Sequence, residues 1–194
     1  APETRFDLPI INTETGRATP NYAFAGKIDK IIRRPDGTLA IREHKTTGES
    51  IDVTSDYWRR LRLDQQISGY MHAARTLGYA VQTVDYDVLR KASIRPKMIK
   101  GVRETIEQFG DRLTADIAER PDFYFCRREI PRLESDLAQF QQELWDTAQI
   151  IHGQIQRDRF PRTTASCVRP YRCQFLDICD RDLTEVPDGF VRVE

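Results

Sequence analysis

The sequence lacks any long apolar run, and this absence excludes several classes of protein. No stretch approaches the ~18 apolar residues of a membrane-spanning helix, and no basic segment followed by an apolar one marks an export signal. Internal repeats and low-complexity segments are also missing, so a repeat architecture is not indicated. With 194 residues, 39% of them hydrophobic and 31% charged, the chain is expected to be soluble and globular, without a membrane partner.

Three further features are scarce or missing. Only four cysteines occur, and without an export signal they favour a reducing compartment and, if they act together, metal rather than disulfides. The chain begins at Ala1 rather than methionine, and we expect that native residues precede it. The net charge is zero, which argues weakly against nucleic acid as a partner, although the distribution of charge matters more than its sum.

A β-hairpin is the clearest local structure that the sequence predicts. Residues 24–32 and 39–46 are rich in branched and aromatic residues, which favour strands. Between them lies Arg34-Pro-Asp-Gly37, whose Pro and Asp-Gly are typical of a turn. Two antiparallel strands joined by a turn centred near Asp36 follow from this pattern.

The hairpin is expected to bring acidic and basic residues together. Its symmetry places Asp29 opposite Glu43, unless a bulge at Gly37 shifts the pairing by one residue. Glu43 and Lys45 share a face because side chains alternate along a strand. Two carboxylates and an ammonium would then converge, an arrangement suited to a divalent cation beside a charged substrate. For an arbitrary hairpin, a solvated face with a cross-strand ion pair is the more usual explanation.

Hydrophobic periodicity predicts the remaining elements. The expected strands are residues 4–11 (at an edge because of Pro9), 81–89 (parallel to a strand of the hairpin) and 123–130. Residues 93–100 are expected to form a basic loop, and helices are expected at 58–78, 105–120 and 133–159. In the first helix one apolar face should comprise Leu63, Ile67, Tyr70 and Ala74. This order predicts an α/β fold with a mixed sheet flanked by helices.

Three motifs follow one another within residues 22–80: Gly26-Lys-Ile-Asp29, Glu43-His-Lys45 and Gln66-Ile-Ser-Gly-Tyr70. In this order they resemble the PD-(D/E)XK nuclease superfamily, and within it the RecB-type branch that includes CRISPR-associated and phage-encoded exonucleases. The resemblance implies a restriction-endonuclease-like mixed sheet. We therefore expect one nuclease domain over residues 1–194, truncated at its N-terminus, with residues 160–194 as a cysteine-containing tail.

The resemblance also implies roles for the hairpin residues. Asp29 and Glu43 would hold Mg²⁺ or Mn²⁺, with the backbone carbonyl of His44 as a third ligand. Lys45 would orient or acidify the attacking water, or offset charge in the transition state. The His44 side chain points to the opposite face of the sheet and is expected to be structural.

The helical motif is expected to support this site. Gln66 and Tyr70 lie on one helix face at i,i+4, and the resemblance implies that they orient active-site groups and contact the DNA backbone. Outside this context, helix surface and a core tyrosine would explain the pair. RecB-type relatives often have a further His or Glu ligand ahead of the first strand; in residues 1–21 only Glu3 and Glu14 are weak candidates for it.

Three basic runs flank the candidate site. One has six basic residues and no acidic one between Arg90 and Arg103, a second is Arg59 to Arg62, and a third has five arginines and one acid between Arg157 and Arg172. Each run alone is more typical of a solvated face. Together they predict tracks for a phosphate backbone, with Lys97 and Lys100 among the DNA-binding residues.

The cysteines are concentrated in the tail. Cys167, Cys173 and Cys179 resemble the C-terminal cysteines that hold an iron–sulfur cluster in several RecB-type exonucleases, although the usual first gap is shorter and no cysteine precedes Gly26. Zinc and buried free thiols are the alternatives. Cys126 lies among aromatic residues and is expected to be buried, so we expect a fourth ligand from outside this sequence.

These features predict a Mg²⁺- or Mn²⁺-dependent deoxyribonuclease that acts as an exonuclease in phage or bacterial DNA recombination and repair. Its expected location is the cytoplasm of a bacterial cell or of a phage-infected host, with a helicase or recombination protein as a candidate partner. A structure-specific endonuclease with the same core is one alternative. A nucleic-acid-binding module that has lost activity is the other, and the intact set of Asp29, Glu43 and Lys45 argues against it.

Overall fold

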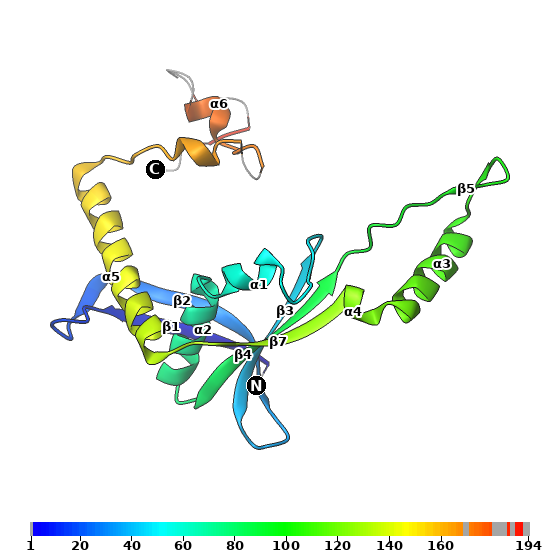
Figure 1. Ribbon diagram of the computed structural model, residues 1–194. Helices are drawn as coiled ribbons and strands as arrows, with labels where there is room; N and C mark the ends of the chain where they lie inside the picture. The colour runs from blue at the N-terminus through cyan, green and yellow to red at the C-terminus, as the bar shows by residue number, and fades with distance from the viewer. Residues whose placement is uncertain (1, 169–170, 180–185, 187–188, 192–194) are drawn as a thin grey trace. The chain divides into compact units, whose positions relative to one another are not determined.

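The structure is a computed structural model, and it describes residues 2–168, 171–179, 186 and 189–191. The chain forms two compact units, Ala1–Gln149 and Ile150–Glu194. The first unit contains a five-stranded sheet in the order β1-β2-β3-β4-β7 (Figure 1). Whether both units belong to one nuclease domain stays a prediction from the sequence.

The sheet is mixed, as predicted. β3 and β4 run parallel, whereas β1–β2, β2–β3 and β4–β7 are antiparallel pairs. Its strands are β1 (Pro2–Ile11), β2 (Ala18–Arg33), β3 (Leu39–Thr47), β4 (Val81–Arg90) and β7 (Phe125–Pro131). Pro9 lies in the edge strand β1, where its missing N–H leaves no ladder bond unmade. The predicted α/β, restriction-endonuclease-like fold is therefore confirmed.

Helices cover one face of the sheet. α1 (Asp56–Leu61), α2 (Gln65–Thr76) and the first part of α5 (Glu134–Arg157) share its apolar core (Figure 1). The fully buried members of this core include Ile28, Ile41, Ile67, Met71, Val81, Val84 and Val88. The opposite face carries ion pairs, in which Asp85 meets Arg34 and Arg42, and Asp87 meets His44 and Arg127. On this face Asp85 is buried and needs its two arginine partners, whereas His44 and Arg127 remain accessible to solvent.

The prediction of a single helix over residues 58–78 is wrong, because this segment forms two separate helices, α1 and α2. Leu63, expected on the apolar face, lies between them and is 87% exposed. Asp64 begins the second helix by accepting a hydrogen bond from the N–H of Gln66 at 2.7 Å. The predicted stop is confirmed, since Gly78 adopts a positive φ of 89° directly after the C-cap.

Between β4 and β7 the chain forms an arm, defined here as residues 91–120. The arm contains a two-stranded hairpin, β5 (Met98–Ile99) and β6 (Val102–Arg103), where the sequence predicted only a basic loop. The predicted second helix is confirmed as α3 (Ile106–Glu119), which begins with a capping box of Thr105 and Gln108. Pro121 then starts α4 (Pro121–Tyr124), so β7 begins two residues later than predicted.

In the second unit, the described residues form little regular structure beyond the end of α5. Its other described elements are a short 3₁₀ helix (Thr164–Ser166) and α6 (Leu176–Cys179). In α5 Leu137, Phe140 and Ala148 are buried, whereas Ile151, which follows Ala148 on the same face at i,i+3, is 42% exposed. No described residue between 160 and 179 is buried. Among the described residues, no helix is long and apolar enough to cross a bilayer.

Candidate active site

The candidate site lies where β2 and β3 separate. The three hairpin pairs are symmetric about residue 36, as predicted, without the shift that a bulge would cause. This ladder ends at Ile31–Ile41, and on the far side of that point β2 pairs with β1 instead. Asp29 and Glu43 occupy matching positions two residues beyond the last pair of the ladder. The two carboxylates therefore lie where β2 has left β3, and they are close enough for the charge of Asp29 to act on Glu43.

A chain of polar contacts connects the motifs of β3 and α2. The Nζ of Lys45 lies 2.5 Å from Oε1 of Glu43 and donates a hydrogen bond to Oε1 of Gln66 at 2.9 Å. The Nε2 of Gln66 donates in turn to the hydroxyl of Tyr70 at 3.1 Å. Strand and helix thus bring together four side chains that the sequence singled out, and their catalytic role stays a prediction.

Glu43 is the buried member of this cluster. Its side chain is only 3% exposed, and its Oε2 has no hydrogen-bond partner among the described residues. Burial raises the pKa of this carboxyl, and the negative charge of Asp29 adds to the rise, while the Lys45 ammonium opposes it. A buried carboxylate oxygen without a partner is costly, so Oε2 is an acceptor that a cation would satisfy.

Lys45 remains a cation in this environment. Burial acts to lower its pKa, but the hydrogen bond and charge of Glu43 outweigh burial, so the pKa of Lys45 is raised. An ammonium can donate three hydrogen bonds. Among the described residues, Glu43 and Gln66 accept one each. One donor position is left for a water or a phosphate oxygen.

Asp29 and Glu43 fit a magnesium-type donor set. Mg²⁺ is commonly bound by one or two carboxylates plus waters and substrate phosphate oxygens, rather than by a full cage of protein ligands. Accordingly, no three His, Cys, Asp or Glu side chains of the described residues converge on one point. Asp29 is exposed and Glu43 offers an unpaired oxygen, so both have coordination capacity. The backbone carbonyl of His44 stays the predicted third ligand.

The position of α2 depends on Arg132, a residue that no sequence pattern singled out. This side chain is buried and donates to the carbonyls of Leu61 and Asp64 at 2.7 and 3.0 Å and to the hydroxyl of Ser68 at 2.8 Å. It therefore fixes the junction of α1 and α2, directly before Gln66. Because Arg132 lies 68 residues after Asp64, no local pattern could reveal this contact.

Close packing also fixes α2 against the sheet. A Cβ on Gly69 would come within 2.8 Å of Cζ of Phe24 and 3.2 Å of Cζ of Phe140. Beside this contact lies a pocket of about 380 Å³ that was not predicted and that includes Gln66 and Tyr70 in its lining. Burial raises the pKa of the Tyr70 hydroxyl, so this group stays protonated at neutral pH.

The predicted basic tracks differ in how many of their side chains form ion pairs with carboxylates of the same chain. Within the described residues, Lys97 and Lys100 form no ion pair, whereas Arg59 pairs with Asp56 and Arg60 with Glu49. The Arg90–Arg103 run therefore keeps more of its charge for an external anion than the Arg59–Arg62 run. Part of the Arg157–Arg172 run, residues 169–170, lies outside the described residues.

The four cysteines are free thiols. In the tail, the N–H of Cys173 donates to the carbonyl of Cys167 at 2.8 Å, which brings two of the three predicted cluster ligands close in backbone terms. The described residues do not form a three-ligand metal group there, so the cluster stays a prediction. Cys126, which was expected to be buried, is half-buried and packs against the core of the sheet unit.

Comparison with known proteins agrees with this geometry. The family model of the PD-(D/E)XK nuclease superfamily matches residues 2–180, which include the sheet, the motif-bearing helix α2 and most of the described tail. No curated protein sequence matches the chain significantly. The finer assignment to the RecB-type branch rests on the sequence resemblance alone. The chain belongs to the PD-(D/E)XK nuclease superfamily.

Proposed function

We propose that this protein is a Mg²⁺- or Mn²⁺-dependent deoxyribonuclease. Its active site for phosphodiester hydrolysis comprises Asp29, Glu43 and Lys45. The observation that carries the proposal is the contact chain from Glu43 through Lys45 and Gln66, beside the point where β2 leaves β3. A structural ion pair would not need the buried, unpartnered Oε2 of Glu43. Membership of a nuclease superfamily supports DNA as the substrate.

Each residue has a distinct task in this proposal. Asp29 and Glu43 hold the divalent cation, which when bound polarises the phosphate and lowers the pKa of water. Lys45 uses its remaining donor position to orient the attacking water or to stabilise charge on the phosphate oxygens. Gln66 keeps the Lys45 ammonium in place by accepting a hydrogen bond from it. Tyr70 in turn fixes the amide of Gln66.

We further propose exonuclease activity in phage or bacterial DNA recombination and repair, with a helicase or recombination protein as partner and the cytoplasm as location. The resemblance of the three ordered motifs to RecB-type exonucleases supports this assignment. A structure-specific endonuclease is the second candidate, because the same catalytic residues serve both activities. The described tail, which has no buried residue, supports an iron–sulfur cluster at Cys167, Cys173 and Cys179, because a metal would supply order that packing does not.

A cleavage assay tests the activity. We expect Asp29→Ala and Glu43→Ala to lose cleavage of labelled DNA in Mg²⁺ or Mn²⁺, and EDTA to abolish it in the wild type, because lost coordination removes several kcal/mol of transition-state stabilisation. Linear and covalently closed circular substrates separate the two nuclease classes, since an exonuclease needs an end. Unchanged folding of the variants is checked by circular dichroism.

Asp87→Asn is a matched control. Asp87 lies on β4, next to His44 of β3. Both side chains are on the sheet face opposite to Glu43 and Lys45, and there Asp87 pairs with Arg127 at 2.7 Å. Its substitution removes a carboxylate near the site without touching the carboxylates of Asp29 and Glu43 or the ammonium of Lys45, so cleavage is expected to persist. Wild-type turnover in Asp29→Ala or Glu43→Ala would refute the site assignment. Loss of activity in all three variants would point to a general effect of charge.

A further inference from the structure

The tip of the arm exposes apolar side chains that no part of the described chain covers. Met98, Ile99 and Val102 are 63%, 40% and 70% exposed. Cross-strand partners share a face, so Ile99 and Val102 lie on one face of the hairpin, while Met98 lies on the other with Arg103. Apolar contact area is therefore present on both faces. A hairpin that docks on the surface of a protein partner needs apolar side chains on only one of its faces.

Cations flank these apolar side chains. Lys97, Lys100 and Arg103 form no ion pair with any carboxylate that the structure describes. Lys100 also has a positive φ of 50°, next to Gly101 at 83°. This two-residue turn favours Asn-Gly, and a lysine is strained in the first position. Binding of an anion by the Lys100 ammonium would explain why a lysine occupies this strained position at the tip.

A buried ion pair makes the hairpin rigid. The carboxylate of Glu104, whose side chain is 2% exposed, accepts hydrogen bonds from Arg112 at 2.7 and 2.9 Å. It also accepts one from the N–H of Lys97 at 3.1 Å, and Arg112 donates to the carbonyl of Arg95 at 2.8 Å. Both strands of the hairpin are thus tied to α3. The exposed tip is held in a fixed shape rather than left as a loose loop.

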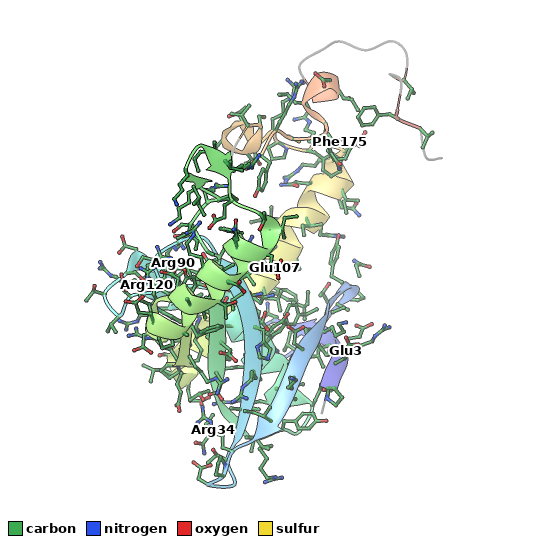
Figure 2. The ribbon with its side chains drawn as sticks, turned by 90° about the vertical axis from the view of Figure 1, so that its right-hand side faces the viewer. Glu3, Arg34, Arg90, Glu107, Arg120 and Phe175 are labelled. Atoms are coloured by element: carbon green, nitrogen blue, oxygen red, sulfur yellow. The ribbon has the colours of Figure 1, made fainter. Side chains whose placement is uncertain are left out.

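The arm starts next to the candidate active site. Arg90, the last residue of β4, pairs with Thr47, two residues beyond Lys45 on β3. The guanidiniums of Arg90 and Arg120 both stack on the ring of Phe123, at 4.0 and 4.5 Å from its centroid, and Figure 2 shows the two arginines close together. These contacts fix the start and the end of the arm to each other, at the end of the sheet where Lys45 lies.

We propose that the β5–β6 hairpin, at the end of the arm farthest from the sheet (Figure 1), is a wedge that enters the base stack of duplex DNA and separates its strands before they reach the active site. Met98, Ile99 and Val102 contact the bases that become unstacked, and the flanking cations Lys97, Lys100 and Arg103 bind phosphates on either side. Nucleobases have apolar faces and the backbone has regular negative charge, so the alternation of apolar and cationic side chains matches this ligand. The role rests on DNA being the substrate, as proposed above.

The test measures base unstacking in EDTA, where cleavage does not occur. Duplex DNA carrying 2-aminopurine at its terminal base pairs, a base that brightens when unstacked, is titrated with the full chain. We expect the wild type to increase the fluorescence, and Met98→Ser/Ile99→Ser/Val102→Ser to lose the increase while the salt dependence of binding is kept. Lys97→Gln/Lys100→Gln should instead weaken binding and lower the salt slope by about 2 units, one per lost phosphate contact.

Ile106→Ser is the matched control, because Ile106 is 93% exposed and lies on the arm but outside the hairpin. It should retain the wild-type fluorescence increase. An undiminished increase in the triple tip variant overturns the wedge and leaves the tip as a protein-docking surface. Equal loss in Ile106→Ser also overturns it. DNA cleavage without unstacking refutes the wedge alone, whereas absence of DNA binding by the wild type refutes the proposed function as well.

Discussion

At position 43 a carboxylate is placed where its charge is costly. Because burial raises the pKa of Glu43 above that of the unfolded chain, the folded protein holds this proton more tightly than the unfolded one. The contribution of Glu43 to the free energy of unfolding therefore falls as pH rises from the unfolded pKa through the folded one. Lys45 offsets part of this cost. A cation at the unpartnered Oε2 would offset more, which couples metal binding to stability.

Removing Lys45 should shift the pH dependence of metal binding. The ammonium lowers the pKa of Glu43, so Lys45→Gln raises it further. Because a protonated carboxyl is a poor metal ligand, Mn²⁺ affinity should decline at a higher pH than in the wild type. Metal should still bind at about pH 8, since lysine is a donor and not a ligand. Calorimetric titrations between about pH 5 and 8 measure the shift.

Cleavage by Lys45→Gln should be lost even at the alkaline end of this range. Lys45→Arg is the control, because it retains the positive charge beside Glu43 and should keep the wild-type pH dependence of Mn²⁺ affinity. Loss of Mn²⁺ affinity at every pH with cleavage retained would contradict the role assigned to this lysine. So would an unchanged pH dependence in Lys45→Gln.

At the level of elements, the separation of α1 from α2 determines where Gln66 lies. The carbonyls at this junction cannot all be fully bonded within the helices, and Arg132, which lies between β7 and α5, donates hydrogen bonds to those of Leu61 and Asp64. Burial lowers the pKa of Arg132, yet a guanidinium stays charged at neutral pH. A distant buried side chain thus positions a motif residue that binds Lys45.

Arg132→Met should lower the free energy of unfolding by about 2–4 kcal/mol, because buried carbonyl and hydroxyl groups lose their partner. It should also lower kcat more than it raises KM for DNA, since Gln66 is displaced while the phosphate-binding cations remain. Urea unfolding and steady-state kinetics measure the two effects. Arg59→Met is the control: its ion pair with Asp56 is solvent-accessible on both sides, so about 1 kcal/mol or less is expected. Equal effects of both substitutions would contradict the argument.

The contrast between hairpin and helices shows which elements the sequence could predict. The hairpin register depends on a local turn, Arg34 to Gly37, and its symmetry about residue 36 was therefore predictable. The break at Leu63 was not, because the apolar spacing continues through it and the deciding contact comes from Arg132. The β5–β6 strands have two residues each, too few for periodicity to detect, and Glu104 and Arg112 meet only in the folded arm.

On the scale of the whole molecule, the two units differ in what keeps them folded. The sheet unit has a continuous apolar core that includes Ile28, Ile41 and Met71. In the described tail, by contrast, the large apolar side chains remain exposed, at 62% for Val168 and 84% for Tyr171. Burial therefore contributes little to the order of the tail. A metal bound by its cysteines would supply that order through its binding free energy.

Metal removal should therefore unfold the tail and leave the sheet unit intact. Protein purified without oxygen and with its native N-terminus should contain iron and absorb visible light. After chelation or oxidation, trypsin should cut at Arg162 and Arg172, while the urea midpoint of the sheet unit changes little. Cys173→Ser should behave like the metal-free protein, whereas Cys126→Ser should keep its metal, because Cys126 packs on the core of the sheet unit. A tail that resists trypsin in protein free of both iron and zinc would contradict the cluster.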